Sequence, residues 1–470
     1  MQLVCNDNKL YSELILIVKL FYSNHELENL NIQINQEISL ISNCLHNTIT
    51  ITNNKQTLFN NSVNLTDYEL KDLAKYKKHY SKIALYEALS KFTKKSLPWG
   101  SLTGIRPTKL FYELKQISGS SIIAKNDLIN KYHVSPEKAE IVYNTTKHQT
   151  KLVINDKLID FYVNIPFCTS KCYYCSFISV PLKQCEQLVE PYINALLTEI
   201  KQAKQIIKNN NYIVKSIYIG GGTPTSLSAE QLDKILSELN YPVQEFTVEA
   251  GRPDTITKEK LDVFKKHNVT RISINPQTFS NKTLKAIGRG HTSEDIVNVY
   301  NMAKPYNFIV NMDLIAGLKD EKFSTFKNSL NLTMQLKPQN ITVHTLSVKR
   351  TSELETSNAE LTSEKQVKKM VDYAYKTLTK NGYNPYYLYK QKNMIGNLEN
   401  IGYALNKTEC IFNIDTMEEV ASVMACGANA ISKRYFSTFN RIERQPNVKN
   451  LNEYITRVNE MIAKKQDFFS

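Results

Sequence analysis

The sequence predicts an α/β fold in which a parallel sheet is built from repeated strand–helix units. From about residue 158, six short β-rich runs alternate with helical stretches, a rhythm typical of parallel strands joined by helical crossovers. Glycine and polar residues gather where these runs end, which is where sites form in parallel α/β folds. An open doubly wound sheet and a partial barrel both fit this pattern. We expect three parts: an amino-terminal α+β domain (1–150), the α/β region (151–355) and a C-terminal region (356–470).

Composition narrows the class of protein. The chain has 470 residues, enough for a large buried core, and no run of 18 apolar residues, so no membrane span is expected. Eight cysteines are too few for a disulfide scaffold, which indicates a reducing, cytoplasmic setting. The net charge is +14, but the lysines are spread along the chain without a dense basic block, so nucleic acid is not an expected partner.

The amino-terminal domain is expected to combine strands with one long helix. The apolar run at residues 13–22 (ELILIVKLFY) and the alternating run at 48–52 (TITIT) are predicted as strands. Residues 66–95 predict a single helix, with Thr66 or Asp67 as its cap.

A segment that contains two prolines and two glycines follows this helix. Residues 97–110 (LPWGSLTGIRPTKL) hold Trp99, the only tryptophan of the chain. A large ring between Pro98 and Gly100 favours burial on a fixed backbone. We therefore expect this segment to dock the amino-terminal domain onto the α/β region.

The α/β region supplies the strands and helices of the predicted sheet. Its strands are expected at residues 159–165, 215–221, 245–251, 270–277, 308–317 and 340–348. Helices are expected between them, among others at residues 228–240, 257–268 and 280–288. From about residue 355 the pattern becomes irregular, which indicates a C-terminal appendage.

Three of the eight cysteines stand close together after the first of these strands. Cys168, Cys172 and Cys175 have the spacing C-x3-C-x2-C. Structural zinc prefers four protein ligands, and the only cysteine nearby, Cys185, lies in a charged helical stretch. Three thiolates suit a [4Fe–4S] cluster with one iron left open, whereas cysteine-ligated clusters normally use four. Zinc and chance clustering remain as alternatives.

This motif, with Tyr174 just before the last cysteine, resembles the radical S-adenosylmethionine (SAM) superfamily. The resemblance implies a partial (β/α)6 TIM-like barrel, a [4Fe–4S] cluster held by Cys168, Cys172 and Cys175, and SAM bound to the open iron. It also implies that an electron from the cluster cleaves SAM to a 5′-deoxyadenosyl radical, which abstracts hydrogen. A reducing electron donor protein is then an expected partner.

The glycine-rich turn IYIGGGTPTSL after the second strand is the next motif. Its glycines allow close approach of the backbone to a ligand. The string GGGTPT resembles the oxygen-independent coproporphyrinogen III oxidase branch of the superfamily, and the polar residues at later strand ends follow that branch's order. The resemblance implies that these residues contact SAM: Tyr162, Tyr174, Gly221, Gly222, Thr223, Glu249, Gln277, Arg289 and Asp313.

Further strings resemble the HemZ-type coproporphyrinogen dehydrogenase-like proteins, among them INPQTF, GRGHT, NMDLIAGL and LPWGSLTGIRPTK, over about residues 95–435. This resemblance implies oxygen-independent oxidative decarboxylation of coproporphyrinogen III to protoporphyrinogen IX in haem biosynthesis, with a tetrapyrrole as substrate. Arg252, Lys349 and Arg350 are candidates to meet its propionates. No catalytic side chain is assigned.

One departure keeps two other functions open. Established oxidases of this branch carry a further cysteine two residues after the last ligand, where this chain has Phe177, as the related haem-chaperone branch does. A haem-binding delivery protein is therefore the first alternative, with His291 or His344 as possible haem ligands. Radical SAM modification of RNA is the second alternative, and only the positive charge favours it.

Overall fold

The computed structural model describes residues 1–22, 24–104, 106–149, 154–175, 179–347, 362–391, 394–439 and 441–470. It divides into two compact units, Met1–Tyr143 and Asn144–Ser470. The boundaries expected near residues 150 and 355 lie outside the described residues. In the described parts, no helix is both long and apolar enough to cross a bilayer.

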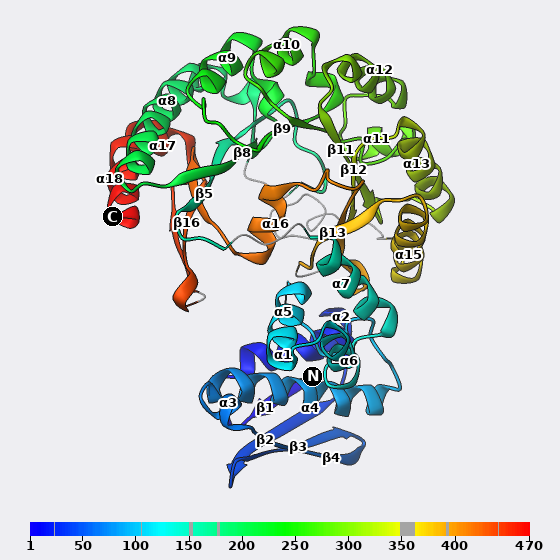
Figure 1. Ribbon diagram of the computed structural model, residues 1–470. Helices are drawn as coiled ribbons and strands as arrows, with labels where there is room; N and C mark the ends of the chain where they lie inside the picture. The colour runs from blue at the N-terminus through cyan, green and yellow to red at the C-terminus, as the bar shows by residue number, and fades with distance from the viewer. Residues whose placement is uncertain are drawn as a thin grey trace. The chain divides into compact units, whose positions relative to one another are not determined.

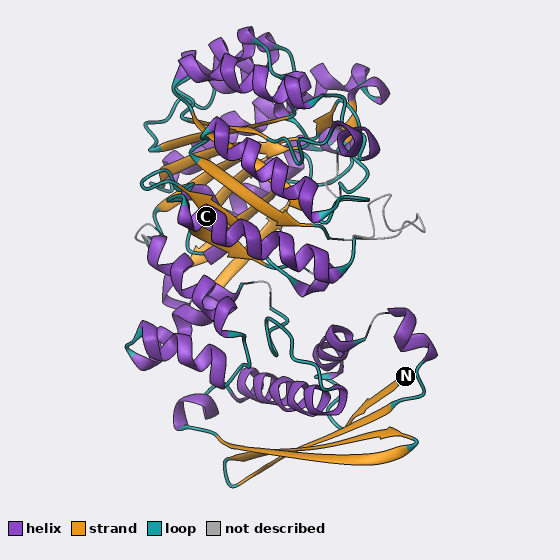
Figure 2. Cartoon of the chain, turned by 90° about the vertical axis from the view of Figure 1, so that its right-hand side faces the viewer, coloured by secondary structure: helices purple, strands orange, loops and turns teal. Residues whose placement is uncertain are grey.

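The first unit is a four-stranded sheet with helices packed on it (Figure 2). The strand order is β1-β2-β3-β4; β1 and β2 are parallel and the other pairs are antiparallel. Its strands are β1 (Gln2–Cys5), β2 (Gln33–Ile41), β3 (Cys44–Asn53) and β4 (Lys55–Asn64). Its helices are α1 (Tyr11–Phe21), α2 (Asn24–Asn29), α3 (Asp67–Leu70), α4 (Leu73–Thr93), α5 (Pro107–Ser118) and α6 (Ser121–Asn130), and α7 (Pro136–His148) spans the division between the units.

The strand predicted at 13–22 is wrong, because these residues form helix α1. The buried side chains of α1 are Leu14, Ile17, Val18 and Phe21, a spacing that puts one apolar stripe on a helix. The strand at 48–52 is confirmed within β3.

The single helix predicted at 66–95 is two helices. Thr66 caps α3 in a capping box with Glu69, as the sequence indicated. The helix then breaks, and α4 starts after Asp72, whose side chain accepts a hydrogen bond from the Lys75 N–H. A second capping residue six positions after the first therefore divides the helix.

Trp99 is buried in the segment after α4. The backbone around it is fixed: the Ser101 N–H donates to the Tyr132 carbonyl and the Ser135 N–H donates to the Pro98 carbonyl, both at 2.9 Å. Its docking onto the α/β region stays a prediction.

The second unit contains the predicted parallel sheet, and all six predicted strands are confirmed. They lie side by side in sequence order and are all parallel, within an eleven-stranded sheet that is curved, with helices on its outer side (Figure 1). The partial (β/α)6 barrel is thus confirmed. The strands are β5 (Leu158–Ile165), β8 (Ile213–Gly221), β9 (Glu245–Gly251), β10 (Arg271–Ile274), β11 (Ile309–Ala316) and β12 (Asn340–Thr345).

The crossover helices bury their apolar faces against this sheet. The predicted helices are confirmed as α9 (Ala229–Ser237), α10 (Lys258–Lys266) and α11 (Asn281–Ala286). The others are α8 (Glu186–Asn209), α12 (Ser293–Ala303), α13 (Phe323–Leu336) and α15 (Glu364–Lys380). The strand residues in this core are apolar, such as Ile159, Phe161 and Val163 of β5, and they alternate with residues that lie outside it.

The C-terminal region adds strands to both edges of this sheet. Next to β12 lie β14 (Asn400–Ala404) and β13 (Asn384–Tyr389), and next to β5 lie β15 (Ser422–Cys426), β16 (Ile431–Phe436) and β17 (Arg441–Pro446). Helix α16 (Ile411–Glu418) lies on the inner side of the curved sheet (Figure 1). Helices α17 (Leu451–Thr456) and α18 (Val458–Phe469) pack on α8.

Candidate active site

A cavity of about 330 Å³ lies on the inner side of the barrel, at the carboxyl ends of the parallel strands. In this fold the active site forms at that end, because the loops after the strands converge there. The three cysteines and eight of the nine predicted SAM contacts line it: Cys168, Cys172, Cys175, Tyr174, Gly221, Gly222, Thr223, Glu249, Gln277, Arg289 and Asp313.

The cysteine loop follows β5 and is held against the ends of the neighbouring strands. Phe167–Cys168 forms the short strand β6, which pairs with β7 (Val180–Pro181). The Arg252 guanidinium donates to the Ser170 hydroxyl at 2.8 Å and lies 3.9 Å from the Cys172 sulfur. Arg252, which directly follows β9, therefore holds the cysteine loop at the carboxyl end of that strand.

The glycine turn serves mainly to seat this loop. The Gly222 N–H donates to the Ile165 carbonyl at 2.8 Å and the Thr223 N–H donates to the Phe167 carbonyl at 2.7 Å. A side chain at Gly222 would come within 2.9 Å of the Cys168 sulfur. These two N–H groups therefore hold the cysteine loop and are not available to a ligand.

Glu249 at the end of β9 is the carboxylate best placed to meet a cofactor. The Tyr218 hydroxyl donates to it, from the inner face of β8. Burial raises the pKa of Glu249 to about 7, although the hydrogen bonds from Tyr218 and from the Gly221 N–H act in the opposite direction. A ligand hydroxyl could still donate to the ionised carboxylate.

Gln277 and Arg289 also line the cavity. Gln277 has a φ of 65°, and its backbone is held by hydrogen bonds with Asp313 and Ile315 of β11, at 2.8 and 3.0 Å. A non-glycine residue in this conformation is strained, which is frequent at functional sites. Within the described residues, the buried Gln277 Oε1 and Arg289 Nε have no hydrogen-bond partner. Both residues are therefore candidates to contact a ligand in the cavity.

Asp313 and Tyr174 each have a partner within the cavity. Burial raises the pKa of Asp313. His344 at 3.7 Å and Asn311 at 2.8 Å outweigh this effect and hold the pKa of Asp313 below its usual value. The Tyr174 hydroxyl accepts a hydrogen bond from Arg289 at 3.0 Å.

Tyr162 is the one predicted SAM contact that does not line the cavity. Its ring stacks on Phe412, with centroids 5.9 Å apart, and its hydroxyl donates to Asn164. It lies behind Tyr218, whose ring centroid is 6.3 Å away. Tyr162 therefore supports the cavity wall from behind.

Sequence reasoning missed the contribution of α16. Phe412 stacks on Tyr218 with centroids 4.3 Å apart, and Asn413 and Met417 line the cavity. Tyr218 could have been found from its position in β8, since it lies on the same face of the strand as Gly220, two residues later. Nothing in the sequence indicates that a segment about 190 residues later would pack on that face.

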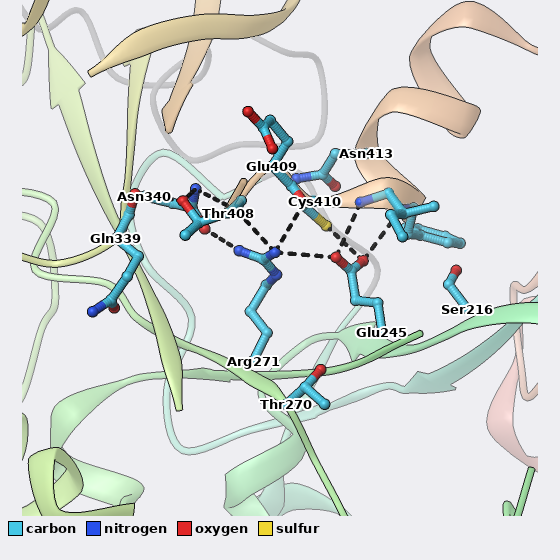
Figure 3. Close-up of polar contacts among 12 residues, drawn as sticks. Ser216, Glu245, Thr270, Arg271, Gln339, Asn340, Thr408, Glu409, Cys410 and Asn413 are labelled. Carbon is cyan, nitrogen blue, oxygen red and sulfur yellow. Dashed lines mark hydrogen bonds and ion pairs between the residues drawn. The ribbon is translucent and has the colours of Figure 1, made fainter. Parts of the chain in front are cut away.

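The start of α16 is anchored to the amino-terminal ends of the barrel strands (Figure 3). The Glu245 carboxylate of β9 accepts hydrogen bonds from the Ile411 and Phe412 N–H groups, at 3.0 and 3.3 Å. Arg271 of β10 pairs with Glu245 at 3.1 Å and donates to the Thr408 and Glu409 carbonyls. A carboxylate at a helix N-terminus satisfies its exposed N–H groups, so this network fixes where α16 begins.

Three further sequence hypotheses can be placed. The Arg252 guanidinium donates to Asp254 and Ser170 and its side chain lines the cavity, and its suggested role with propionates stays a prediction. His291 is buried beside Asp254 and does not line the cavity, whereas His344 does. Lys349, Arg350 and Phe177 lie outside the described residues.

Comparisons with known proteins agree with this geometry. The Radical SAM superfamily profile matches residues 162–333. The chain is 36% identical over 410 residues to the oxygen-independent coproporphyrinogen-III oxidase-like protein HemZ of Bacillus subtilis, covering 84% of this chain and 81% of that protein. The heme chaperone HemW of Bacillus subtilis is 32% identical over 193 residues, 40% of this chain and 50% of HemW.

Among solved structures, the coproporphyrinogen III oxidase HemN from Escherichia coli, described as a radical SAM enzyme, shares the fold. Its TM-score is 0.53 at 22% identity, over 66% of this chain and 71% of that one. A partial barrel with three cysteines after its first strand defines a radical SAM protein. Within that superfamily, the chain belongs to the family of HemZ oxygen-independent coproporphyrinogen-III oxidase-like proteins.

Membership of the superfamily implies a [4Fe–4S] cluster and SAM, and the residues present fit both. The three cysteines line one cavity, and polar residues at the ends of the strands, among them Glu249, Gln277 and Arg289, line it with them. Across the described ranges, no three His, Cys, Asp or Glu side chains converge on the position of a single metal ion. Cys185 is buried in the core at the start of α8 and does not line the cavity.

Proposed function

We propose that this protein is a cytoplasmic radical SAM oxidoreductase that decarboxylates coproporphyrinogen III to protoporphyrinogen IX. The observation that carries the proposal is the single cavity, where the cysteine loop and the carboxyl ends of consecutive strands present thiols, a carboxylate, an amide and a guanidinium together. In this proposal Cys168, Cys172 and Cys175 hold the cluster. Glu249, Gln277, Arg289 and Asp313 hold SAM.

The cluster and SAM, when bound, supply a carbon-centred radical that removes one hydrogen atom from the β-carbon of a substrate propionate. The propionate then loses carbon dioxide and one electron, which an acceptor must take, and a vinyl group is left. A protein donor must first supply the reducing electron. The residues of this chain position the two partners and exclude water, because the cofactors carry the difficult chemistry.

Haem delivery is the second candidate function. HemW, a heme chaperone, is similar to part of this chain, and His344 lines the cavity with Tyr389 as a neighbour at 3.4 Å. An imidazole that lines a cavity is a suitable metal ligand, which makes His344 the candidate haem ligand. Radical modification of RNA has no support beyond the net charge.

Anaerobic product analysis separates these functions. The reconstituted protein is incubated with coproporphyrinogen III, SAM, dithionite and an electron acceptor, and porphyrins are quantified after oxidation. Protoporphyrinogen with loss of two carbon dioxide molecules per substrate supports the oxidase. Stoichiometric haem binding that is lost in His344→Ala, without any product, supports delivery and contradicts the oxidase.

A further inference from the structure

A line of contacts crosses the barrel and ends at Glu249. At one end, Glu245 and Arg271 fix the start of α16 at the amino-terminal ends of β9 and β10. At the other end, the Tyr218 hydroxyl donates to the Glu249 carboxylate at the carboxyl ends of the strands. Phe412 connects the two, because it belongs to α16 and stacks on Tyr218.

The contact between Phe412 and Tyr218 is close and well oriented. The ring centroids are 4.3 Å apart with an interplanar angle of 21°, and Tyr162 covers the other edge of Phe412 at 5.9 Å and 11°. Stacks of this kind contribute beyond their buried area and restrict how each ring can turn. A restricted Tyr218 ring fixes the position of its hydroxyl and, through it, the Glu249 carboxylate.

We propose that Tyr218 and Phe412 are positioning residues for SAM: α16, anchored at the amino-terminal ends of β9 and β10, fixes the ring stack that holds Glu249 at the cavity. The inference rests on the proposed function, since it takes Glu249 as a SAM contact. It adds two residues from separate elements to that contact, one of them from the C-terminal region.

The Tyr218 hydroxyl also has an electrostatic role. Glu249 is faced by Tyr162 from β5, Tyr218 from β8, Asp313 from β11, His344 from β12 and Tyr389 from β13. Burial and the Asp313 charge both raise the Glu249 pKa, while Tyr218 lowers it. Removal of the hydroxyl should therefore leave the carboxyl protonated to a higher pH.

The first test uses Tyr218→Phe, which keeps the ring stack and removes the hydroxyl. The control is Tyr403→Phe, which removes a buried hydroxyl of β14 that has no hydrogen-bond partner in the described residues and does not line the cavity. SAM binding is measured anaerobically on the reconstituted protein without reductant, so that no cleavage occurs, from about pH 6 to about pH 9.

In the wild type, SAM affinity should rise with pH through about 7 as Glu249 ionises. A rise of one pKa unit in Tyr218→Phe would reduce the ionised fraction at pH 7 about fivefold, and affinity with it, while affinity at about pH 9 recovers. Tyr403→Phe should follow the wild type. A wild-type pH midpoint in Tyr218→Phe would overturn the role of Tyr218.

A measurement that needs no SAM distinguishes failure of the proposed function from failure of this inference. The Glu249 carboxyl is titrated by infrared difference spectroscopy of the wild type against Glu249→Gln, and likewise in the Tyr218→Phe background. An upward shift of the Glu249 pKa in Tyr218→Phe, with no SAM binding in any variant, would support the hydrogen bond and refute the cofactor role. No shift would refute the hydrogen bond itself.

The second test addresses α16. Phe412→Leu keeps an apolar side chain and loses the flat ring, and Phe326→Leu on α13 is a control with a similar buried volume outside the cavity. With equal iron content, Phe412→Leu should lose SAM affinity and 5′-deoxyadenosine formation relative to Phe326→Leu. Equal behaviour of the two variants would show that α16 is only a packing element.

Discussion

Glu249 lies near the carboxyl end of β9, and burial raises its pKa to about 7. Replacement by Gln keeps the size of the side chain and removes the charge. A lost hydrogen bond between a SAM hydroxyl and a charged group costs about 1.5–3 kcal/mol, or roughly ten- to a hundredfold in affinity. We expect Glu249→Gln to weaken SAM binding by this factor and to leave iron content unchanged, since its hydrogen bonds within the described residues come from Tyr218 and the Gly221 N–H.

The three cavity cysteines should each be necessary for the cluster. Replacement of Cys168, Cys172 or Cys175 by Ala removes one of only three thiolate ligands, so we expect loss of iron and sulfide and of the reduced-state paramagnetic resonance signal. Anaerobic iron and sulfide analysis of reconstituted protein measures this.

Cys185→Ala is the matched control, because that thiol lies ten residues further on and is buried in the core. It should retain a full cluster. Loss of iron from this control, or stoichiometric zinc in the wild type, would contradict a cluster with three cysteine ligands.

Among single residues, the sequence indicates the polar residues at strand ends more reliably than the apolar residues that pack behind them. Glu249, Gln277, Arg289 and Asp313 stand out because polar groups at the ends of apolar strands have no other obvious role. Phe412 is an apolar residue in an apolar surrounding and gives no such signal. Its contact with Tyr218 depends on a chain segment that returns from far away in the sequence.

Among the elements, the glycine turn after β8 is the one most sensitive to a single methyl group. In Gly222→Ala the new Cβ would lie 2.5 Å from the Phe167 carbonyl oxygen and 2.9 Å from the Cys168 sulfur. Both atoms belong to the cysteine loop, so the loop must move. We expect the folded variant to hold less iron than the wild type after identical reconstitution.

Gly119→Ala is the control, since no atom lies within 4 Å of the Cβ it would introduce, although its positive φ of 70° makes it mildly strained. Full iron occupancy in Gly222→Ala would show that the cysteine loop is not seated by this turn.

The segment around Trp99 offers an independent reporter of the amino-terminal unit. Trp99 is the only tryptophan and is fully buried, so its emission should be blue-shifted and poorly quenched by iodide. Gly100 has a φ of 52°, and a Cβ there would lie 2.2 Å from the Tyr132 carbonyl oxygen. Gly100→Ala should destabilise this unit by about 1–3 kcal/mol, measured by Trp99 emission during urea unfolding. Exposed emission in the folded wild type would contradict this packing.

The elements of the barrel could be predicted because their burial is simple. The parallel strands alternate with helices along the chain, a pattern that predicts them, whereas the apolar run within α1 has no such neighbours and predicts a strand. A mainly apolar run of ten residues, such as 13–22, does not distinguish a helix from a strand unless its buried positions are known. The spacing of Leu14, Ile17 and Phe21 is helical, but its neighbours Ile15 and Leu16 conceal it.

For the second unit as a whole, a buried ion pair attaches the last helix to the first crossover helix. Lys465 of α18 lies 2.7 Å from Glu199 of α8, and Glu199 also accepts from Tyr454, Asn447 and the Gly427 N–H. Removing one partner of such a pair leaves an uncompensated buried charge. We expect Lys465→Met to destabilise this unit by roughly 3–5 kcal/mol in chemical denaturation.

The double variant Glu199→Gln with Lys465→Met should recover part of this loss, because neither buried charge remains. An unchanged unfolding midpoint in Lys465→Met would show that the pair contributes nothing to the attachment of α18. The sequence could not indicate this pair, because its partners are separated by most of the unit and each resembles an ordinary helical surface residue.

The arrangement of β5 has a consequence for the time course of synthesis. This strand is bordered on one side by β8 and on the other by β15, whose Ser422 pairs with Ile159. About 260 residues separate these partners, so at roughly 5–20 residues per second the ribosome needs about 13–50 s to supply the second border. During that interval β5 has one open edge, and the cysteine loop that follows it is accessible to oxidants and competing metals. We therefore expect iron to be delivered to a released, fully folded chain, and nascent chains stalled before residue 422 to carry none.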